Sequence, residues 1–317
     1  MAPRRSRRPL DLCDPATVRA VSRRAGLSPQ HRLGQNFLVD RAVLDTIVSA
    51  LAPDVGDDIL EIGTGIGTLT AVLAARARHV VSMEIDPASV RAARMTLRSF
   101  PNVDIVEGDA LRIDASALGL TPPWLAAGNL PYSLTSPLLN HLFEAGRPPT
   151  RGVFLVQREV AHRLAAPSGD WSLATVAIRS LADVERLTDV APACFQPPPA
   201  VHSSVIRMHP APLMSPAERQ EVLELARPAF QMRRKTLRHG ITRALAGNAT
   251  AAARVLDETG IDPARRPGTL SLEEWRSLAA ASTSASPPPR SSENCPHPGA
   301  PVHDPAPGSL RRSRASR

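Results

Sequence analysis

One stretch of the sequence decides the fold: DILEIGTGIG, residues 58–67. Its first half is short and mostly apolar, which favours a buried strand. Gly63, Gly65 and Gly67 follow at alternate positions, and the apolar spacing of residues 69–77 predicts a helix after them. Glycine at such a strand-to-helix turn lets the backbone approach a ligand closely. We therefore predict a turn that binds a nucleotide-like ligand, with a tight turn that binds nothing as the alternative.

Strands and helices alternate on both sides of this stretch. We expect further strands over residues 79–85, 103–106, 124–127, 152–156 and 203–208, and helices over residues 40–51, 87–99 and 136–145. The strand signals stop after about residue 210, and helices are expected near residues 216–227, 232–246, 250–259 and 271–281. This order predicts an α/β fold, in which a mostly parallel, Rossmann-like sheet is followed by a smaller C-terminal helical domain.

The domain boundaries follow from composition. We expect a loose basic N-terminal extension over residues 1–30, a catalytic domain over 31–210, a helical domain over 211–281 and a disordered Pro/Arg-rich tail over 282–317. The tail has eight prolines and few large apolar groups, so it cannot offset the entropy lost on ordering. Within the extension, Pro15 to Gly26 is expected to form a short helix.

The net charge of +8 says little about the folded core. Residues 1–33 carry +6 and residues 282–317 carry +3, which leaves −1 for residues 34–281. No run approaches the roughly 18 apolar residues of a membrane-spanning helix, so a soluble protein without a membrane partner is expected. The three cysteines form no C-x-x-C pair, which argues against a disulfide framework or a metal site and fits a cytoplasmic location.

Two acidic residues end the strands after the glycine turn. Glu84 lies 21 residues after Gly63, where a carboxylate can accept the hydroxyls of a ribose. Asp109 ends the next strand and could accept from an adenine amino group. Either acid alone could be an ordinary helix cap. These residues are compatible with either NAD or S-adenosylmethionine as the ligand. The Gly-x-Gly-x-Gly spacing favours the methyl donor, because that ligand has no pyrophosphate for the turn to enclose.

A second motif, Asn129-Leu130-Pro131-Tyr132, ends the fourth predicted strand. We call these four residues the tetrad. The side-chain carbonyl of Asn129 and the backbone carbonyl of Pro131 could each accept one N–H of an exocyclic adenine amine and localise its lone pair toward a sulfonium methyl. Tyr132 offers a ring for one face of the base. The alternative is an Asn-capped turn with a core tyrosine.

The target base must lie outside a stacked helix, because this chemistry cannot reach a base inside one. Phe195, at the foot of a proline-rich loop, is a candidate for the opposite face of the base. A buried core phenylalanine is the alternative.

In order along the chain, these motifs resemble the ribosomal RNA adenine N6-dimethyltransferases, most closely the bacterial small-subunit group. The markers lie between about residues 31 and 281 and comprise Gly34-Gln35-Asn36-Phe37-Leu38, the glycine turn, Gly128 to Tyr132, Phe195-Gln196-Pro197-Pro198-Pro199 and Phe230-Gln231-Met232-Arg233-Arg234-Lys235-Thr236-Leu237. The resemblance implies an S-adenosylmethionine-dependent methyltransferase fold.

The resemblance also implies site residues that the pattern alone does not give. Asn36 and Leu38 would contact S-adenosylmethionine together with Gly63, Glu84, Asp109 and Asn129. The RNA-facing residues would be Arg233, Arg234 and Lys235; with Arg238 they belong to a stretch, residues 225–256, that contains no acid. Without the resemblance, these cations would be interpreted as a solvated face.

The expected function is therefore dimethylation of the N6 of two adjacent adenosines near the 3′ end of 16S ribosomal RNA during ribosome biogenesis. The expected partner is small-subunit RNA in an immature 30S particle, and a monomer is expected. The alternatives are a large-subunit RNA methyltransferase that confers macrolide resistance and a noncatalytic ribosome assembly factor that binds through the basic helices. A dinucleotide oxidoreductase would instead bind NAD.

Overall fold

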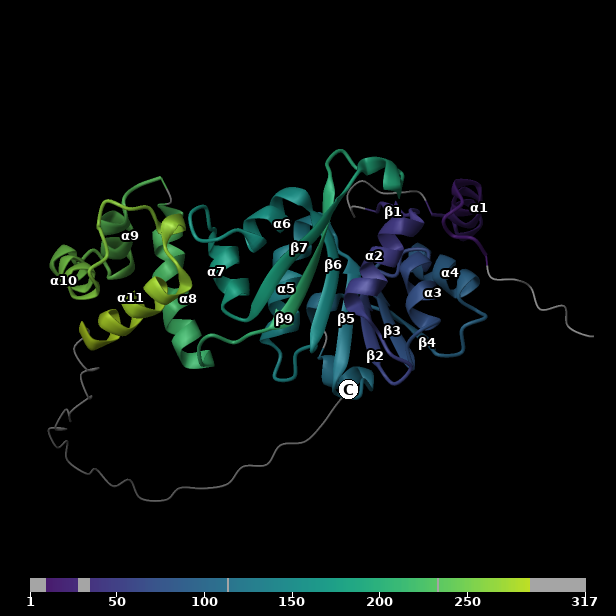
Figure 1. Ribbon diagram of the computed structural model, residues 1–317, viewed down its shortest axis with the longest axis horizontal. Coiled ribbons are helices and arrows are strands. Elements are labelled where there is room, and N and C mark those ends of the chain that lie inside the picture. The colour runs from purple at the N-terminus through teal and green to yellow at the C-terminus, as the bar shows by residue number, and fades with distance from the viewer. Residues whose placement is uncertain (1–9, 28–34, 113, 233, 286–317) are drawn as a thin grey trace, which may run out of the picture. The chain divides into compact units, whose positions relative to one another are not determined.

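A twisted, mostly parallel sheet lies at the centre of the computed structural model, which describes residues 10–27, 35–112, 114–232 and 234–285 (Figure 1). Seven strands of the described chain form this sheet: β2 (Asp58–Ile62), β3 (His79–Glu84), β4 (Val103–Glu107), β5 (Trp124–Asn129), β6 (Arg151–Gln157), β7 (Ala182–Val190) and β9 (Ser203–Pro210). Their spatial order is β4-β3-β2-β5-β6-β9-β7. The first five strands in this order pair in parallel, whereas β9 pairs antiparallel with both β6 and β7.

The order of the strands reverses between β2 and β5. From β2 the chain proceeds outward to β3 and β4, then returns to place β5 on the other side of β2. Ile62 pairs with Gly128 at the carboxyl ends of these two strands. Ligands of open α/β sheets bind outside the carboxyl ends of the strands at such a reversal, so the topology places the glycine turn beside the tetrad.

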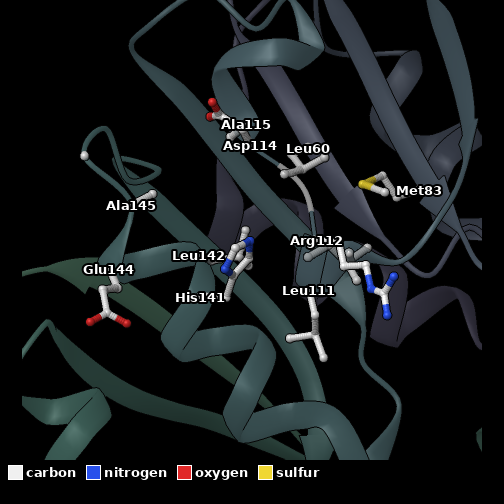
Figure 2. A pocket seen from close by; sticks show the side chains of 13 residues that line it. Leu60, Met83, Leu111, Arg112, Asp114, Ala115, His141, Leu142, Glu144 and Ala145 are labelled. Atoms are coloured by element: carbon white, nitrogen blue, oxygen red, sulfur yellow. The ribbon is translucent and has the colours of Figure 1, made fainter. Parts of the chain in front are cut away.

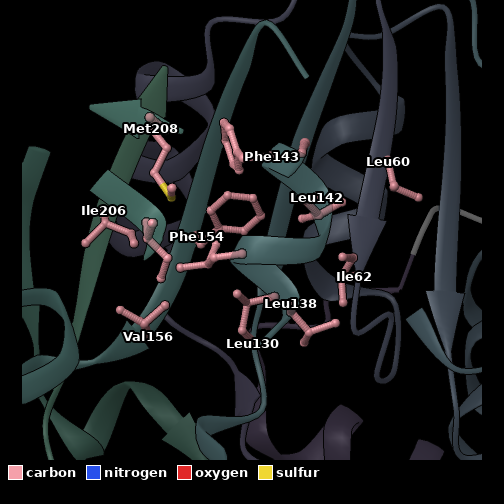
Figure 3. Close-up of a cluster of buried hydrophobic side chains, with 14 of the residues drawn as sticks. Leu60, Ile62, Leu130, Leu138, Leu142, Phe143, Phe154, Val156, Ile206 and Met208 are labelled. Carbon is pink, nitrogen blue, oxygen red and sulfur yellow. The ribbon is translucent and has the colours of Figure 1, made fainter. Parts of the chain in front are cut away.

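Alternate residues of each inner strand enter one of two hydrophobic clusters. Leu60 and Ile62 of β2 face the cluster that contains Leu138 and Phe143, drawn in Figure 3, and Ile59 faces the cluster on the other side. Because both faces are covered, the inner strands are apolar on both sides, as parallel strands usually are.

Helices surround the sheet and continue beyond it. The α-helices are α1 (Pro15–Ala25), α2 (Arg41–Leu51), α3 (Thr68–Ala74), α4 (Pro87–Thr96), α5 (Thr135–Glu144), α6 (Arg158–Ala165), α7 (Leu173–Arg179), α8 (Pro216–Gln231), α9 (Leu237–Ala244), α10 (Ala249–Thr259) and α11 (Leu272–Ala285). Short 3-10 turns are η2 (Ala110–Arg112), η3 (Ala115–Leu118), η4 (Tyr132–Leu134), η5 (Pro192–Cys194) and η6 (Pro267–Thr269). No helix in these described ranges has both the length and the apolar character needed to cross a membrane.

A two-stranded antiparallel ribbon joins distant parts of the chain beside the main sheet. Its strands are β1 (Phe37–Leu38) and β8 (Phe195–Gln196), and Leu38 pairs with Phe195. The ribbon therefore ties the segment before α2 to the proline-rich loop before β9.

The last four α-helices share a hydrophobic cluster of their own, which includes Trp275, Leu237 and Val222. Trp171 and Val176, from the segment before residue 210, also belong to this cluster. Its contacts thus cross the predicted domain boundary at residue 210, and the boundary itself stays a prediction.

Two sequence predictions need correction at the level of elements, and a third is confirmed. Residues 232–236 are a turn rather than the start of a helix, because α8 ends at Gln231 and α9 begins at Leu237. The helix predicted from Pro15 to Gly26 is confirmed as α1, which Asp14 caps and which buries Val18 and Val21. At the other end α11 continues to Ala285, past the predicted start of the tail, and the rest of the tail lies outside the described residues.

Candidate active site

A cavity lies at the reversal point, between the carboxyl ends of β2 and β5. Its lining includes six of the predicted site residues, namely Asn36, Leu38, Gly63, Glu84, Asn129 and Pro131. These come from the segment before α2, the ends of β2, β3 and β5, and the tetrad. The topology therefore brings together residues that are up to about a hundred positions apart in the sequence.

The glycine turn is shaped by close approaches that exclude side chains. Gly63 and Gly65 have φ values of 87° and 55°, in the left-handed region that favours glycine. A Cβ on Gly63 would lie 3.0 Å from the carbonyl oxygen of Asn129, and a Cβ on Gly65 would lie 3.1 Å from the ring of Phe37. The turn thus contacts both the tetrad and the segment before α2.

Glu84 holds the glycine turn from the neighbouring strand. Its Oε2 accepts a hydrogen bond of 2.8 Å from the backbone N–H of Gly65, and its Oε1 accepts one of 3.0 Å from that of Asp86. Burial raises the pKa of Glu84, and these two backbone donors oppose that effect. A carboxylate has about four acceptor positions, so Glu84 can support the turn and still accept from a ligand.

Glu61, which the sequence analysis did not single out, lies directly beneath the turn. It is fully buried, and its Oε2 accepts 2.6 Å hydrogen bonds from both Thr70 and Ser82. Burial raises the pKa of Glu61 to about 7. The signal was an acid inside the otherwise apolar strand β2, since an acid is rarely buried without a partner or a function.

Asn129 is oriented by the segment that faces it. Its Nδ2 donates a 2.9 Å hydrogen bond to the backbone carbonyl of Asn36. This bond assigns the nitrogen and the oxygen of the amide, because the nitrogen must face the carbonyl of Asn36. The Oδ1 atom is then the acceptor that Asn129 can offer to a substrate.

The two middle residues of the tetrad anchor it. Leu130 has 1% of its side chain exposed within a core cluster, and its N–H donates to the carbonyl of Leu155. The carbonyl of Pro131 accepts hydrogen bonds of 3.0 Å from the N–H of Leu134 and 3.2 Å from Oγ1 of Thr135. Both lone pairs of that oxygen are therefore used at the start of α5, which corrects the prediction that it accepts from the base.

Tyr132 completes the tetrad and reaches across to the last strand. Its hydroxyl lies 2.7 Å from Oγ of Ser203, and the residue is half-buried. Burial raises the pKa of Tyr132, while the hydrogen bond with Ser203 lowers it.

A family model described as "Ribosomal RNA adenine dimethylase" matches residues 27–279. The chain belongs to the ribosomal RNA adenine dimethylase family. Members of this family use S-adenosylmethionine as the methyl donor, and the mostly parallel sheet confirms the predicted methyltransferase fold.

Relatives of this dimethylase bear names that agree with the family. The chain is 40% identical over 273 residues to "Ribosomal RNA small subunit methyltransferase A" of Anaeromyxobacter sp. (strain K), covering 82% of this chain and 95% of that protein. It is 38% identical over 283 residues to the protein of the same name from Pelotomaculum thermopropionicum, covering 84% of this chain and 96% of the relative.

Solved structures show the same fold. A dimethyladenosine transferase from Plasmodium falciparum superposes with a TM-score of 0.67 at 24% identity, covering 78% of this chain and 98% of the other. The 23S rRNA methyltransferase ErmE superposes with a TM-score of 0.62 at 27% identity, covering 78% of this chain and all of the other.

Four of the predicted catalytic and donor-binding residues are outside the lining of the cavity at the reversal point: Leu130 and Tyr132 of the tetrad, and Phe195 and Asp109. Phe195 has 2% of its side chain exposed and packs with Leu38 and Val205 in a core cluster, so it is a core residue rather than a stacking surface for the base. Asp109 is outside the lining of the cavity. Its Oδ1 accepts from the N–H of Leu111, and its Oδ2 lies 3.5 Å from Nε of Arg112, so it begins the turn η2.

The predicted RNA-facing cations of the dimethylase lie around the turn between α8 and α9. Arg234, Lys235 and Arg238 are exposed there, and Arg233 lies outside the described residues. They do not contribute to the cavity at the reversal point. Among the residues that the structure describes, no group of three or more His, Cys, Asp or Glu side chains could hold a metal ion.

The dimethylase also has a larger cavity, drawn in Figure 2, whose lining shares no residue with the cavity at the reversal point. Its volume is about 450 Å³, against about 90 Å³ at the reversal point. Leu60 and Met83 line it, together with His141 of α5 and Arg112 of η2, and none of the predicted site residues does. Size alone does not identify the functional site, because the glycine turn and Asn129 meet at the smaller cavity.

Proposed function

We propose that this dimethylase transfers methyl groups from S-adenosylmethionine to the N6 of two adjacent adenosines near the 3′ end of 16S ribosomal RNA during ribosome biogenesis. The observation that carries the proposal is the meeting of the glycine turn with the oriented amide of Asn129. The names of the relatives at 38–40% identity support the small subunit over the large one.

The lining of the cavity suits the methyl donor. Gly63 leaves the backbone open to a close ligand, and Glu84 has acceptor positions for ribose hydroxyls. Within the described chain, Glu61 Oε1 is a buried oxygen without a hydrogen-bond partner, and it suits the cationic amino group of the donor. Asn36 and Leu38 would hold the donor from the opposite side.

When bound, S-adenosylmethionine supplies a methyl group on a positively charged sulfur. The chain's own residues then need to orient the adenine amine, whose lone pair is delocalised into the ring. Asn129 Oδ1 accepts one N–H of the amine, and the backbone carbonyl of Leu130 is the second acceptor that we propose in place of Pro131. The hydrogen bond from the N–H of Leu130 to the carbonyl of Leu155 holds this part of the tetrad backbone in place.

No general base is needed before transfer in this scheme. The amine proton becomes acidic only after the nitrogen has gained a methyl group, and it can then leave to water. Tyr132 supports one face of the base by stacking. Catalysis therefore comes from alignment and from preorganised acceptors.

The exposed cations Arg234, Lys235 and Arg238 are proposed to contact RNA phosphates, together with Arg233. We propose an immature 30S particle as the substrate, a monomeric enzyme and a cytoplasmic location. Contacts to phosphates carry a strong salt dependence, so particle binding should weaken as the salt concentration rises.

The test is methylation of purified unmethylated subunits with a labelled methyl donor, followed by digestion of the RNA to nucleosides. We expect labelled N6-dimethyladenosine from small subunits and none from large subunits. Label only in large-subunit RNA would contradict the proposal.

The variant Asn129→Ala should lower turnover by about 100-fold, the scale expected when one preorganised hydrogen-bonding group is removed, and should retain particle binding. Asn102→Ala is the control, because Asn102 bonds the carbonyls of Ala74 and Ala77 and does not line the cavity. Equal turnover in wild type and Asn129→Ala would instead favour a noncatalytic assembly factor.

A further inference from the structure

The tetrad is supported by a residue that comes some seventy positions later in the chain. Oγ of Ser203 lies 2.7 Å from the hydroxyl of Tyr132, and Ser203 is fully buried. Ser203 is the first residue of β9, where it pairs with Gln157 of β6 and with Val190 of β7. Its hydroxyl is therefore fixed by strands on both sides.

We infer that Ser203 is a positioning residue for methyl transfer, holding the ring of Tyr132 against the target adenine through the hydrogen bond between their hydroxyls. This inference rests on the proposed function, because it concerns the same site.

The geometry explains why the ring needs such support. Tyr132 lies in the turn η4, between strand β5 and helix α5, and is only half-buried. A half-buried ring in a short turn can rotate about two side-chain bonds, and a face that stacks on a base must keep one plane. A hydrogen bond at the far end of the ring restrains rotation about the Cα–Cβ bond, because that rotation swings the hydroxyl away from Ser203. It therefore fixes where the ring lies beside the base.

The neighbouring residue offers a matched comparison. Ser204 is also fully buried, but its Oγ donates a 2.6 Å hydrogen bond to Oδ1 of Asp189. Adjacent residues of a strand face opposite sides of the sheet. Replacing Ser204 by Ala therefore removes the same hydroxyl from the same strand without touching Tyr132.

The experiment compares the full-length variants Ser203→Ala, Tyr132→Phe, Ser204→Ala and the double variant Ser203→Ala/Tyr132→Phe on unmethylated small subunits. We expect Ser203→Ala and Tyr132→Phe each to lower kcat roughly two- to tenfold, the effect of one net hydrogen bond. The KM for the methyl donor should stay unchanged, and Ser204→Ala should leave kcat unchanged. The double variant should be no slower than Tyr132→Phe alone, because both changes remove one interaction.

A second measurement does not depend on activity. Tyr132 is the only tyrosine in the chain, so protein made with isotope-labelled tyrosine gives one set of ring signals by NMR. These signals should shift in Ser203→Ala and remain in place in Ser204→Ala. If Ser203→Ala proves unstable, Tyr132→Phe tests the same bond while leaving β9 intact.

The inference is overturned if Tyr132→Phe keeps wild-type kcat, or if the ring signals are the same in Ser203→Ala and wild type. A wild-type protein that methylates neither subunit overturns the proposed function instead, while the NMR comparison still tests the hydrogen bond. The two failures are thus distinguishable.

Discussion

At the scale of single residues, buried oxygen atoms determine how the site is built. Asn129, Glu84 and the glycines could be predicted from the sequence, because their types and spacing follow from the ligand they would bind. Ser203 and the true role of the Pro131 carbonyl could not, because both depend on partners that only the fold brings near. The burial of Phe195 could not be predicted either, because its place in the sequence was consistent with both a core residue and a stacking surface.

The buried carboxyl of Glu61 predicts a pH-dependent stability. Its pKa in the folded protein is about 7, above its ordinary value of 4.5, so the folded state binds the proton more tightly than the unfolded chain does. This contribution is fully present below about pH 4.5 and is lost as the pH rises through 7. At about 1.4 kcal/mol per pH unit, the change amounts to about 3 kcal/mol.

The variant Glu61→Gln should remove this dependence. The Oε1 of a glutamine can still accept from Thr70 and Ser82, and its charge does not change with pH. In urea unfolding, the stability of Glu61→Gln relative to wild type should therefore rise between pH 5 and pH 7. Glu218→Gln is the control: hydrogen bonds from Ser215 lower the pKa of this exposed acid from its ordinary value of 4.5, so its difference from wild type should stay nearly constant between pH 5 and pH 7. A flat difference for Glu61→Gln across this range would refute the assignment.

At the scale of elements, long regular segments were predictable and short or exposed ones were not. Strand β2 lies where the apolar run predicted it, over residues 58–62. Strands β1 and β8 have two residues each and pair across more than 150 positions, so no local pattern marks them. Strand β7 was missed because its alternation of buried and exposed residues breaks after Glu185, where the pairing register shifts between Arg186 and Thr188.

Helix α1 gives the element-scale prediction. Its residues Val18 and Val21 share a cluster with Phe37 and Ile66, both of which line the cavity at the reversal point. Val18→Ala should lower the free energy of unfolding by about 1–2 kcal/mol, from lost burial and the space left behind. It should also weaken binding of the methyl donor, because the residues behind the glycine turn lose support.

Calorimetric titration of the donor and urea unfolding measure these two effects. Arg19→Ala, an exposed position on the same helix, should change neither quantity. Unchanged donor affinity in Val18→Ala would show that α1 is independent of the site.

At the scale of the whole molecule, one buried cation joins the C-terminal helices to the rest of the fold. Arg219 of α8 is 7% exposed, and its guanidinium donates to Asn140 and Glu144 of α5 and to Ser180 after α7. Helix α5 begins at Thr135, directly after the tetrad and η4. The helices on either side of the proposed RNA-facing cations are therefore attached to the helix that begins at the carboxyl end of the sheet.

The variant Arg219→Met should separate binding of the small subunit from binding of the methyl donor. Methionine fills similar space but donates no hydrogen bond, so we expect the free energy of unfolding to fall by about 2–3 kcal/mol, somewhat less than for a fully buried ion pair because Glu144 is half exposed. The KM for small subunits should rise, whereas donor affinity should not change. Arg207→Met removes an exposed pair with Glu185 and should cost less than about 1 kcal/mol. If Arg207→Met raised the KM for small subunits as much as Arg219→Met does, the effect would not be specific to Arg219.

The place of β9 in the sheet has a consequence for synthesis. This strand is the last of the sheet to be translated, yet it lies between β6 and β7 and carries the hydroxyl that contacts Tyr132. A nascent chain therefore cannot complete its own catalytic centre until residues up to about 210 have left the exit tunnel. We therefore expect methyl transfer to reach its full rate only after about two thirds of the chain has been made.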